Sequence, residues 1–154
     1  MFKFIDKIFK KSEQKNLKNL DYLIFGRFWS DNYGTYELFK LTDKEIFVDR
    51  SETWHNKRHS QEGYSFEGIA LSDKKFEIAK DLINNVPKNI LNKNFKGFYT
   101  TGNKNENQLI VEIFDGNLKK SITIDSYEIE TKDLSVDLKK FRILTENLIK
   151  ELNK

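Results

Sequence analysis

The sequence contains no cysteine, which excludes disulfide bonds, thiolate nucleophiles and cysteine-ligated zinc or iron–sulfur sites. A chain without cysteine also fits a reducing compartment. No apolar run in it approaches the roughly 18 residues that a membrane-spanning helix needs. Residues 1–20 have neither the uninterrupted apolar stretch nor the small-residue cleavage site of a secretory signal. These absences together predict a cytoplasmic protein.

Arginine is scarce, because only four of the 27 basic residues are arginines: Arg27, Arg50, Arg58 and Arg142. The charge is also uneven. Residues 1–20 carry six lysines against two acids, whereas the rest of the chain has 21 bases and 22 acids. Base-edge and bidentate phosphate recognition favour arginine, and binding to a duplex requires a basic face. A neutral, arginine-poor body therefore argues against a nucleic acid partner.

Signatures of known enzyme chemistry are missing as well. The sequence has no GxSxG nucleophile motif, no phosphate-binding P-loop and no dinucleotide-binding GxGxxG. Asp49 and Asp125 each follow an apolar run and would serve as paired carboxylates if they met, but acids at strand ends are usual in turns. The sequence therefore predicts no cofactor and no catalytic residue, and an enzyme is the less favoured class.

Aromatic residues, by contrast, are abundant, with 13 Phe, six Tyr and two Trp, and each can bury a large area. Many stand in short runs with β-branched residues, bounded by Asp, Asn and Gly, which is the pattern of strands and tight turns. Tight turns are predicted at Thr42-Asp43-Lys44 and at Asp115-Gly116-Asn117. Leu109, Val111 and Ile113 should point to one face of their strand, and the residues between them to the other. The predicted strands are 21–30, 35–41, 45–49, 64–71, 96–102, 108–114 and 118–125, with 126–130 extending or ending the sheet.

Two segments have the apolar spacing of amphipathic helices. The first begins at Ser72, which can cap its N-terminus, and ends before Pro87, the single proline. The second runs from about Leu134 to Leu152. The helix residues expected in the core are Leu82, Ile83, Val86, Phe141, Leu144 and Leu148.

The order of these elements predicts an α+β fold: an antiparallel sheet of about six to eight strands in two meanders, with two main helices packed on one face. Residues 1–19 form a basic leader and linker that includes a short N-terminal amphipathic helix, and residues 20–154 form a single α+β domain. Residues 22–92 and 95–153 share an order of hairpin, strand and helix, so a divergent repeat is one interpretation. Any ββαββα chain would show the same order.

The first hairpin has apolar side chains on both faces. Because two helices on the same side cover only one face of a sheet, an aromatic face should remain for a protein partner or a second copy. The loop 51–66 adds Trp54, which either pins that loop to the core or anchors a partner. The candidate partner-binding residues are Arg27, Trp29, Tyr33, Tyr36, Trp54, His55, Arg58 and His59.

The two histidines support an alternative function. His55 and His59 are four residues apart, which on a helix places both rings on one side, as zinc ligands are placed. With Glu52 or Glu62 as a further ligand, they would suit a metal-assisted hydrolase. The flanking residues show no apolar period and no HExxH pattern, so an exposed polar loop is the favoured interpretation and no metal is predicted.

The leader supports a second alternative, a peripheral membrane protein anchored by residues 1–11. Its apolar residues are spaced as in a short amphipathic helix, with lysines between them. One such helix binds an anionic membrane surface weakly, so docking on its own domain or fraying is favoured. The residues that would contact a membrane are Phe2, Ile5, Ile8 and Phe9.

A non-catalytic protein-binding domain is the function that these observations favour. The general build, a small α+β domain rich in lysine and asparagine, is similar to many uncharacterised bacterial proteins. Immunity proteins that neutralise a cognate toxin are commonly of that build. The resemblance implies an immunity or inhibitor role, and it is an analogy at the level of the fold.

Overall fold

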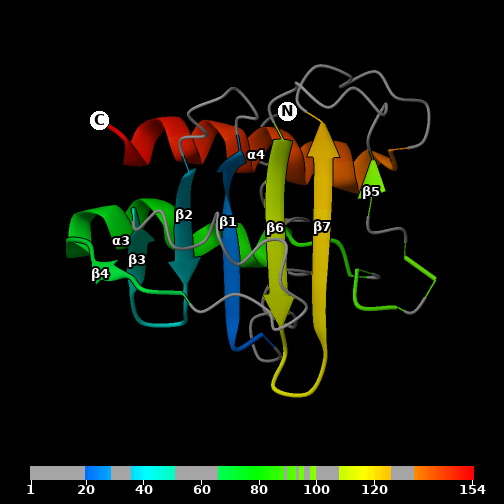
Figure 1. Ribbon diagram of the computed structural model, residues 1–154, viewed down its shortest axis with the longest axis horizontal. Coiled ribbons are helices and arrows are strands. Elements are labelled where there is room, and N and C mark those ends of the chain that lie inside the picture. The colour runs from blue at the N-terminus through cyan, green and yellow to red at the C-terminus, as the bar shows by residue number, and fades with distance from the viewer. Residues whose placement is uncertain are drawn as a thin grey trace, which may run out of the picture.

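One mixed sheet runs through the part of the chain that the computed structural model describes, namely residues 20–28, 36–50, 66–88, 90–92, 94–95, 98–99, 108–125 and 134–154. Its strand order is β4-β3-β2-β1-β6-β7-β5 (Figure 1). The strands are β1 (Tyr22–Phe28), β2 (Tyr36–Leu41), β3 (Ile46–Asp49), β4 (Ile69–Ala70), β5 (Phe98–Tyr99), β6 (Gln108–Phe114) and β7 (Lys119–Asp125). The predicted leader, 1–19, lies outside the described residues.

Six of the strands pair in an antiparallel ladder, which confirms the α+β class with an antiparallel sheet. The seventh, β5, pairs with β7 in parallel at the edge. A second meander would require β5 beside β6, so that part of the predicted topology is not observed. Propensity and turn signals specify a strand but not its neighbour, and two residues of β5 are too few to carry a pairing signal.

The tight turns use the residues that the sequence indicated. Between β2 and β3, the Thr42 hydroxyl oxygen accepts hydrogen bonds from the backbone N–H groups of Lys44 and Glu45, at 3.3 and 3.0 Å. Between β6 and β7, the Asp115 carboxylate accepts from two backbone N–H groups further along the turn. Gly116 has a φ of 96°, which side-chain-bearing residues rarely adopt. These contacts set the register of both hairpins.

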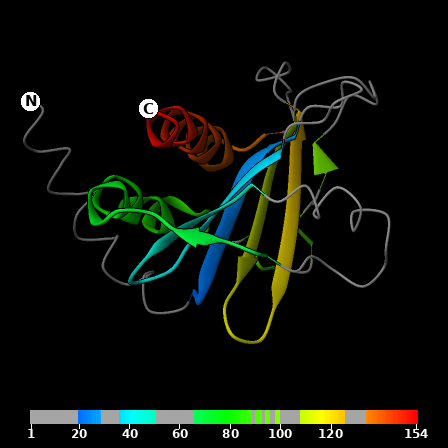
Figure 2. The same cartoon turned by 60° about the vertical axis from the view of Figure 1, so that its left-hand side comes forward.

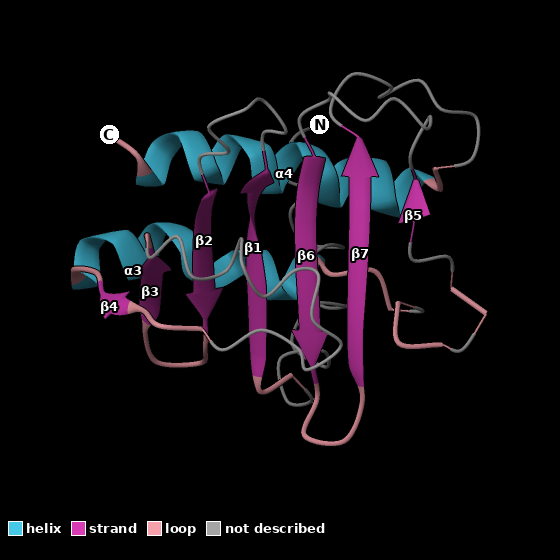
Figure 3. Ribbon diagram, viewed as in Figure 1, coloured by secondary structure: helices cyan, strands magenta, loops and turns pink. Residues whose placement is uncertain are grey.

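The helices lie on one side of the sheet, as Figure 2 shows. Helix α3 (Asp73–Ala79) continues as a 3-10 helix, η1 (Lys80–Asn85), and helix α4 (Val136–Leu152) lies beside them (Figure 3). The hydroxyls of Ser72 and Ser135 accept hydrogen bonds from backbone N–H groups of the first turns of α3 and α4.

The first predicted helix therefore changes type before it ends. The Asn85 amide donates to the backbone carbonyl of Asp81 at 2.9 Å, which is a side-chain alternative to the α-helical hydrogen bond. Pro87 restricts Val86 to an extended conformation, with ψ of 128°, and removes the next donor. The sequence predicted where the helical segment ends, but not that its last turns are a 3-10 helix.

The main core lies between the helices and the sheet. Phe25 and Phe39 stack at its centre with ring centroids 5.5 Å apart. Leu109, Val111 and Ile113 all face this core, which confirms the predicted alternation of that strand. Of the helix residues predicted to be buried, Leu144 is partly buried and packs against the cluster. The others, Leu82, Ile83, Val86, Phe141 and Leu148, belong to it.

Helix α4 also buries polar residues that the apolar stripe did not indicate. Arg142 is 1% exposed, and its Nε donates to the Glu146 carboxylate at 3.4 Å. Thr145 is fully buried and donates its hydroxyl proton to the Phe141 carbonyl. Glu146 also lies 3.7 Å from the guanidinium of Arg27 on β1. These contacts join α4 to the end of the central strand.

Candidate binding surface

The sheet face opposite the helices, called here the outer face, is less open than the sequence predicted. Its apolar centre is buried: Ile24, Leu38 and Ile110 are 8, 2 and 9% exposed. Tyr22 and Phe66 pack against these three residues. The expectation of a broad exposed aromatic face is therefore wrong for this central region. A single-sequence pattern shows that apolar residues occupy both faces, but not which of them the chain covers.

The accessible part of the outer face is a group of aromatic and charged side chains beside this buried centre. The Tyr22 ring lies 5.3 Å from the Phe114 ring, measured between centroids. The Lys40 ammonium lies 4.6 Å from the Tyr22 ring centroid and 5.9 Å from that of Phe66. The Tyr22 hydroxyl donates to the Glu112 carboxylate at 3.0 Å. The outer-face cluster consists of Tyr22, Lys40, Phe66, Glu112, Phe114 and Lys119.

Strand order and register build this cluster. Tyr22 lies opposite Phe114 on the neighbouring strand, and Glu112 is two residues along on the same face. Lys119 lies opposite Phe114 from the other side, and its ammonium is 3.6 Å from the Glu112 carboxylate. Diagonal neighbours on one face of a sheet are within reach of long side chains. Residues far apart in sequence therefore meet in one network.

Glu112 is the electrostatic centre of the cluster, because its side chain is only 8% exposed and its carboxylate contacts both the phenol and the ammonium. Burial raises the pKa of the Tyr22 phenol above its ordinary value, and the negative charge of Glu112 and the hydrogen bond to it raise it further. The same negative charge raises the pKa of Lys119. The arrangement stabilises a neutral tyrosine and a charged lysine on either side of one carboxylate.

These pKa shifts predict how stability depends on alkaline pH. The folded protein holds the Tyr22 and Lys119 protons more tightly than the unfolded chain. The resulting stabilisation is fully present below about pH 10, and it is lost as the pH rises through the higher folded-state values. Replacing Tyr22 with phenylalanine should therefore make the free energy of unfolding fall less steeply between about pH 9 and about pH 11.5, as measured by urea denaturation.

The slope, not the stability at one pH, is the informative quantity, because Tyr22→Phe also leaves Glu112 without its phenol donor at every pH. Lys74→Met, a change at an exposed lysine of α3, is the control and should keep the slope of the unaltered protein. Equal slopes for Tyr22→Phe and the unaltered chain would show that the phenol proton is not held more tightly in the folded state.

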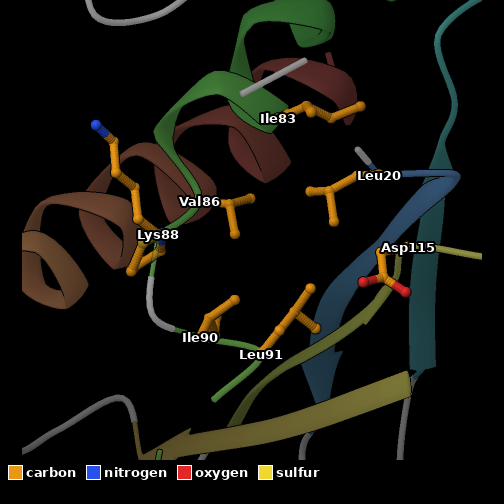
Figure 4. Close-up of a pocket in the computed structure, with 8 residues that line it drawn as sticks. Leu20, Ile83, Val86, Lys88, Ile90, Leu91 and Asp115 are labelled. Atoms are coloured by element: carbon orange, nitrogen blue, oxygen red, sulfur yellow. The ribbon is translucent and has the colours of Figure 1, made fainter. Parts of the chain in front are cut away.

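A small pocket lies on the opposite side of the sheet from the cluster. Leu20, Val86 and Leu91 point toward one another in it, and the Lys88 ammonium points away (Figure 4). Its volume is about 150 Å³, which is enough for one benzene-sized group and below the roughly 300 Å³ at which ligand sites begin. Its walls are Leu20, Ile83, Val86, Pro87, Lys88, Ile90, Leu91 and Asp115.

The structure places two of the predicted contact residues. Arg27 points to the helix side, toward Glu146, and not to the outer face. Tyr36 begins β2 opposite Phe28, and only its backbone is described. Contact of either residue with a partner remains a prediction. The other predicted contact residues, Trp29, Tyr33, Trp54, His55, Arg58 and His59, lie outside the described residues.

The two strand-end acids do not meet. Asp49 is 2% exposed, and its carboxylate accepts a hydrogen bond from the Glu67 backbone N–H at 2.8 Å. Asp125 ends β7, and β2, β1 and β6 lie between the two strands. At the usual strand spacing, this separates the acids by roughly 19 Å. Within the described ranges, no group of three or more histidine, aspartate or glutamate side chains is placed to hold a metal ion.

Of the residues in the cluster, only Glu112 was indicated by the sequence pattern. Glu112 interrupts an apolar strand on the face predicted to lie away from Leu109, Val111 and Ile113. A carboxylate at such a position needs partners in the fold. The sequence did not indicate which residues supply them, because Tyr22 is 90 residues away.

No protein-family model matches the chain, and no curated protein matches it in sequence. Among the helices of the described residues, none combines the length and the apolar composition that crossing a membrane requires.

Proposed function

We propose that this chain is a non-catalytic protein-binding domain and that the outer-face cluster is its contact surface. The observation that supports the proposal is the grouping of three partly exposed aromatic rings, Tyr22, Phe66 and Phe114, around charged side chains. Interface centres are enriched in aromatic residues, which supply large contact areas, and charged groups beside them supply specificity.

The internal contacts of Glu112 favour binding over catalysis. A general base or nucleophile must have an oxygen available to the reacting group. Here the Tyr22 hydroxyl and the Lys119 ammonium both contact Oε1 of Glu112, and the Glu112 side chain is only 8% exposed. Little of the acid is open to a reacting group, and its contacts hold neighbouring side chains in place. A rigid arrangement of side chains lowers the entropy lost on association.

The partner is proposed to be another protein and not a second copy of the chain. The specific form of the proposal is an immunity or inhibitor role toward a cognate toxin, of a bacterial type. Its support is the general build described above, which is an analogy and not a feature of the cluster. The cluster itself supports only the more general function of binding a protein.

Site-specific photo-crosslinking in the native host tests the proposal. A photoreactive phenylalanine analogue at Lys119, whose side chain is 52% exposed, should give a discrete adduct with another protein. The same analogue at Val136, which is 82% exposed on α4, is the matched control and should not give that adduct. Mass spectrometry identifies the captured protein, and its binding to the purified chain is then measured directly.

The direct measurement uses Phe66→Ala, which removes a ring outside the strands and so leaves the sheet pairing in place. Removing one aromatic residue from the centre of an interface typically weakens binding by about tenfold or more, and we expect at least this loss of affinity for Phe66→Ala. The same adduct at positions 119 and 136, or an adduct between two copies of the chain, would contradict the proposal. So would unchanged affinity of a folded Phe66→Ala variant.

A further inference from the structure

Lys40 differs from the other charged members of the outer-face cluster because its partners within the chain are aromatic rings. Its ammonium lies over Tyr22 and near Phe66, at 4.6 and 5.9 Å from the ring centroids. In the part of the chain that the structure describes, no carboxylate lies within salt-bridge distance of it. Cation–π contacts orient a lysine without neutralising its charge.

The cluster as a whole therefore carries an unbalanced positive charge. It contains two lysines, Lys40 and Lys119, and one acid, Glu112, whose carboxylate faces Lys119 at 3.6 Å. The lysines approach from opposite sides, since β2 and β7 flank the central pair β1 and β6. Both ammonium groups lean toward Tyr22 and Glu112 between them.

A partner that binds the cluster would contact its two lysines and little of its acid, Glu112. Glu112, the acid of the cluster, is 6% exposed, and Asp49 on the same face is 2% exposed. Asp125, which the register also places on this face, ends β7 six residues from Lys119, and only its backbone is described. The Lys119 side chain is 52% exposed, and Lys40 is partly exposed. The exposed charge of the cluster is therefore positive, and aromatic rings lie beside it.

We infer that the outer-face cluster recognises an acidic protein segment, and that a carboxylate of the segment pairs with Lys40 while its apolar neighbours rest on the aromatic rings. The inference rests on the proposed function, because it names the chemistry of the partner at the same surface. Opposite charges at an interface favour association and exclude partners of the wrong sign.

The surroundings of Lys40 suit this role physically. The two rings hold the ammonium in place, so Lys40 loses less side-chain entropy when a partner binds it than a lysine that moves freely in water would lose. The rings also exclude some water, which lowers the local dielectric and strengthens an ion pair formed there. A lysine on a helix surface, such as Lys74, has neither advantage.

A peptide titration followed by NMR of the full chain tests the inference. The probe is a short synthetic peptide of alternating glutamate and phenylalanine, and the comparison peptide carries glutamine in place of glutamate. The glutamate peptide should shift the signals of Tyr22, Lys40 and Phe66 and bind at least about tenfold more tightly than the glutamine peptide. This preference should disappear at about 0.5 M salt.

Lys40→Met keeps most of the length of the side chain and removes its charge, and it should abolish the preference for glutamate. Lys74→Met is the matched control and should preserve it. The inference of an acidic partner would be overturned if the two peptides bind the cluster equally, or if folded Lys40→Met still prefers the glutamate peptide. Either result would leave the proposed function intact. Failure of both peptides to perturb the cluster also overturns the inference, whereas the crosslinking experiment decides the proposed function separately.

Discussion

Gly26→Ala is expected to lower the free energy of unfolding by roughly 3 kcal/mol or more, among the largest effects of a single methyl group. Gly26 lies in β1, between β2 and β6 at the centre of the sheet. A Cβ at this position would overlap the Glu37 carbonyl oxygen and lie 3.0 Å from the Leu38 Cα, both of them backbone atoms. No side-chain rotation relieves that overlap, so β1 and β2 would have to separate.

Gly68→Ala is the matched comparison for this experiment. The atoms that a Cβ at Gly68 would overlap most belong to the Phe66 ring, a side chain that can rotate away, although the Phe47 Cβ lies 2.9 Å from it. We expect a loss of about 1 kcal/mol, visible as a smaller shift of the urea midpoint. Equal losses for the two substitutions would show that the Gly26 backbone is not held tightly between its neighbours.

Phe141→Ala is expected to lower the free energy of unfolding by about 3–5 kcal/mol. Phe141 is 1% exposed, and it belongs to the main core between α4 and the sheet. Truncation removes the apolar area of the ring and leaves a cavity that the neighbouring strands and helices can close only partly. Thermal unfolding should show a fall in Tm of roughly 10 °C for a chain of this size.

Ile143→Ala provides the control on the same helix. Ile143 is two residues further along α4 and 49% exposed, so its truncation should change the free energy of unfolding by no more than about 0.5 kcal/mol. Both substitutions place alanine in a helix and do not lower its helix propensity. Similar losses at both positions would contradict the packing of α4 against the sheet through Phe141.

Much of the fold could be predicted from local patterns. Alternation assigned Leu109, Val111 and Ile113 to one face of β6, and Ser72 and Pro87 marked the limits of the first helical segment. The Asp115–Gly116 turn identified the second hairpin. Each of these features depends on a few adjacent residues, so the physical preference of the segment and the final structure agree.

Other features of the fold had no local signal. The parallel pairing of β5 depends on which edge the strand reaches, and the 3-10 geometry of η1 depends on Asn85 and on the packing of the preceding turns. Arg142 does not belong to the predicted apolar residues of α4, yet it is buried beside Glu146. A charged residue is buried only where the fold supplies its partner, and sequence spacing along α4 revealed neither its burial nor the proximity of Arg27.

The sequence by itself determined the class of this protein: an α+β order of strands and helices, the absence of cysteine chemistry, and a body of balanced charge. Only the tertiary structure decided where the candidate surface lies. Tyr22, Lys40, Glu112 and Lys119 come from four different strands, and they meet because strand order and register place them on one face. Local preferences act over a few residues, whereas this network depends on contacts across 90 residues.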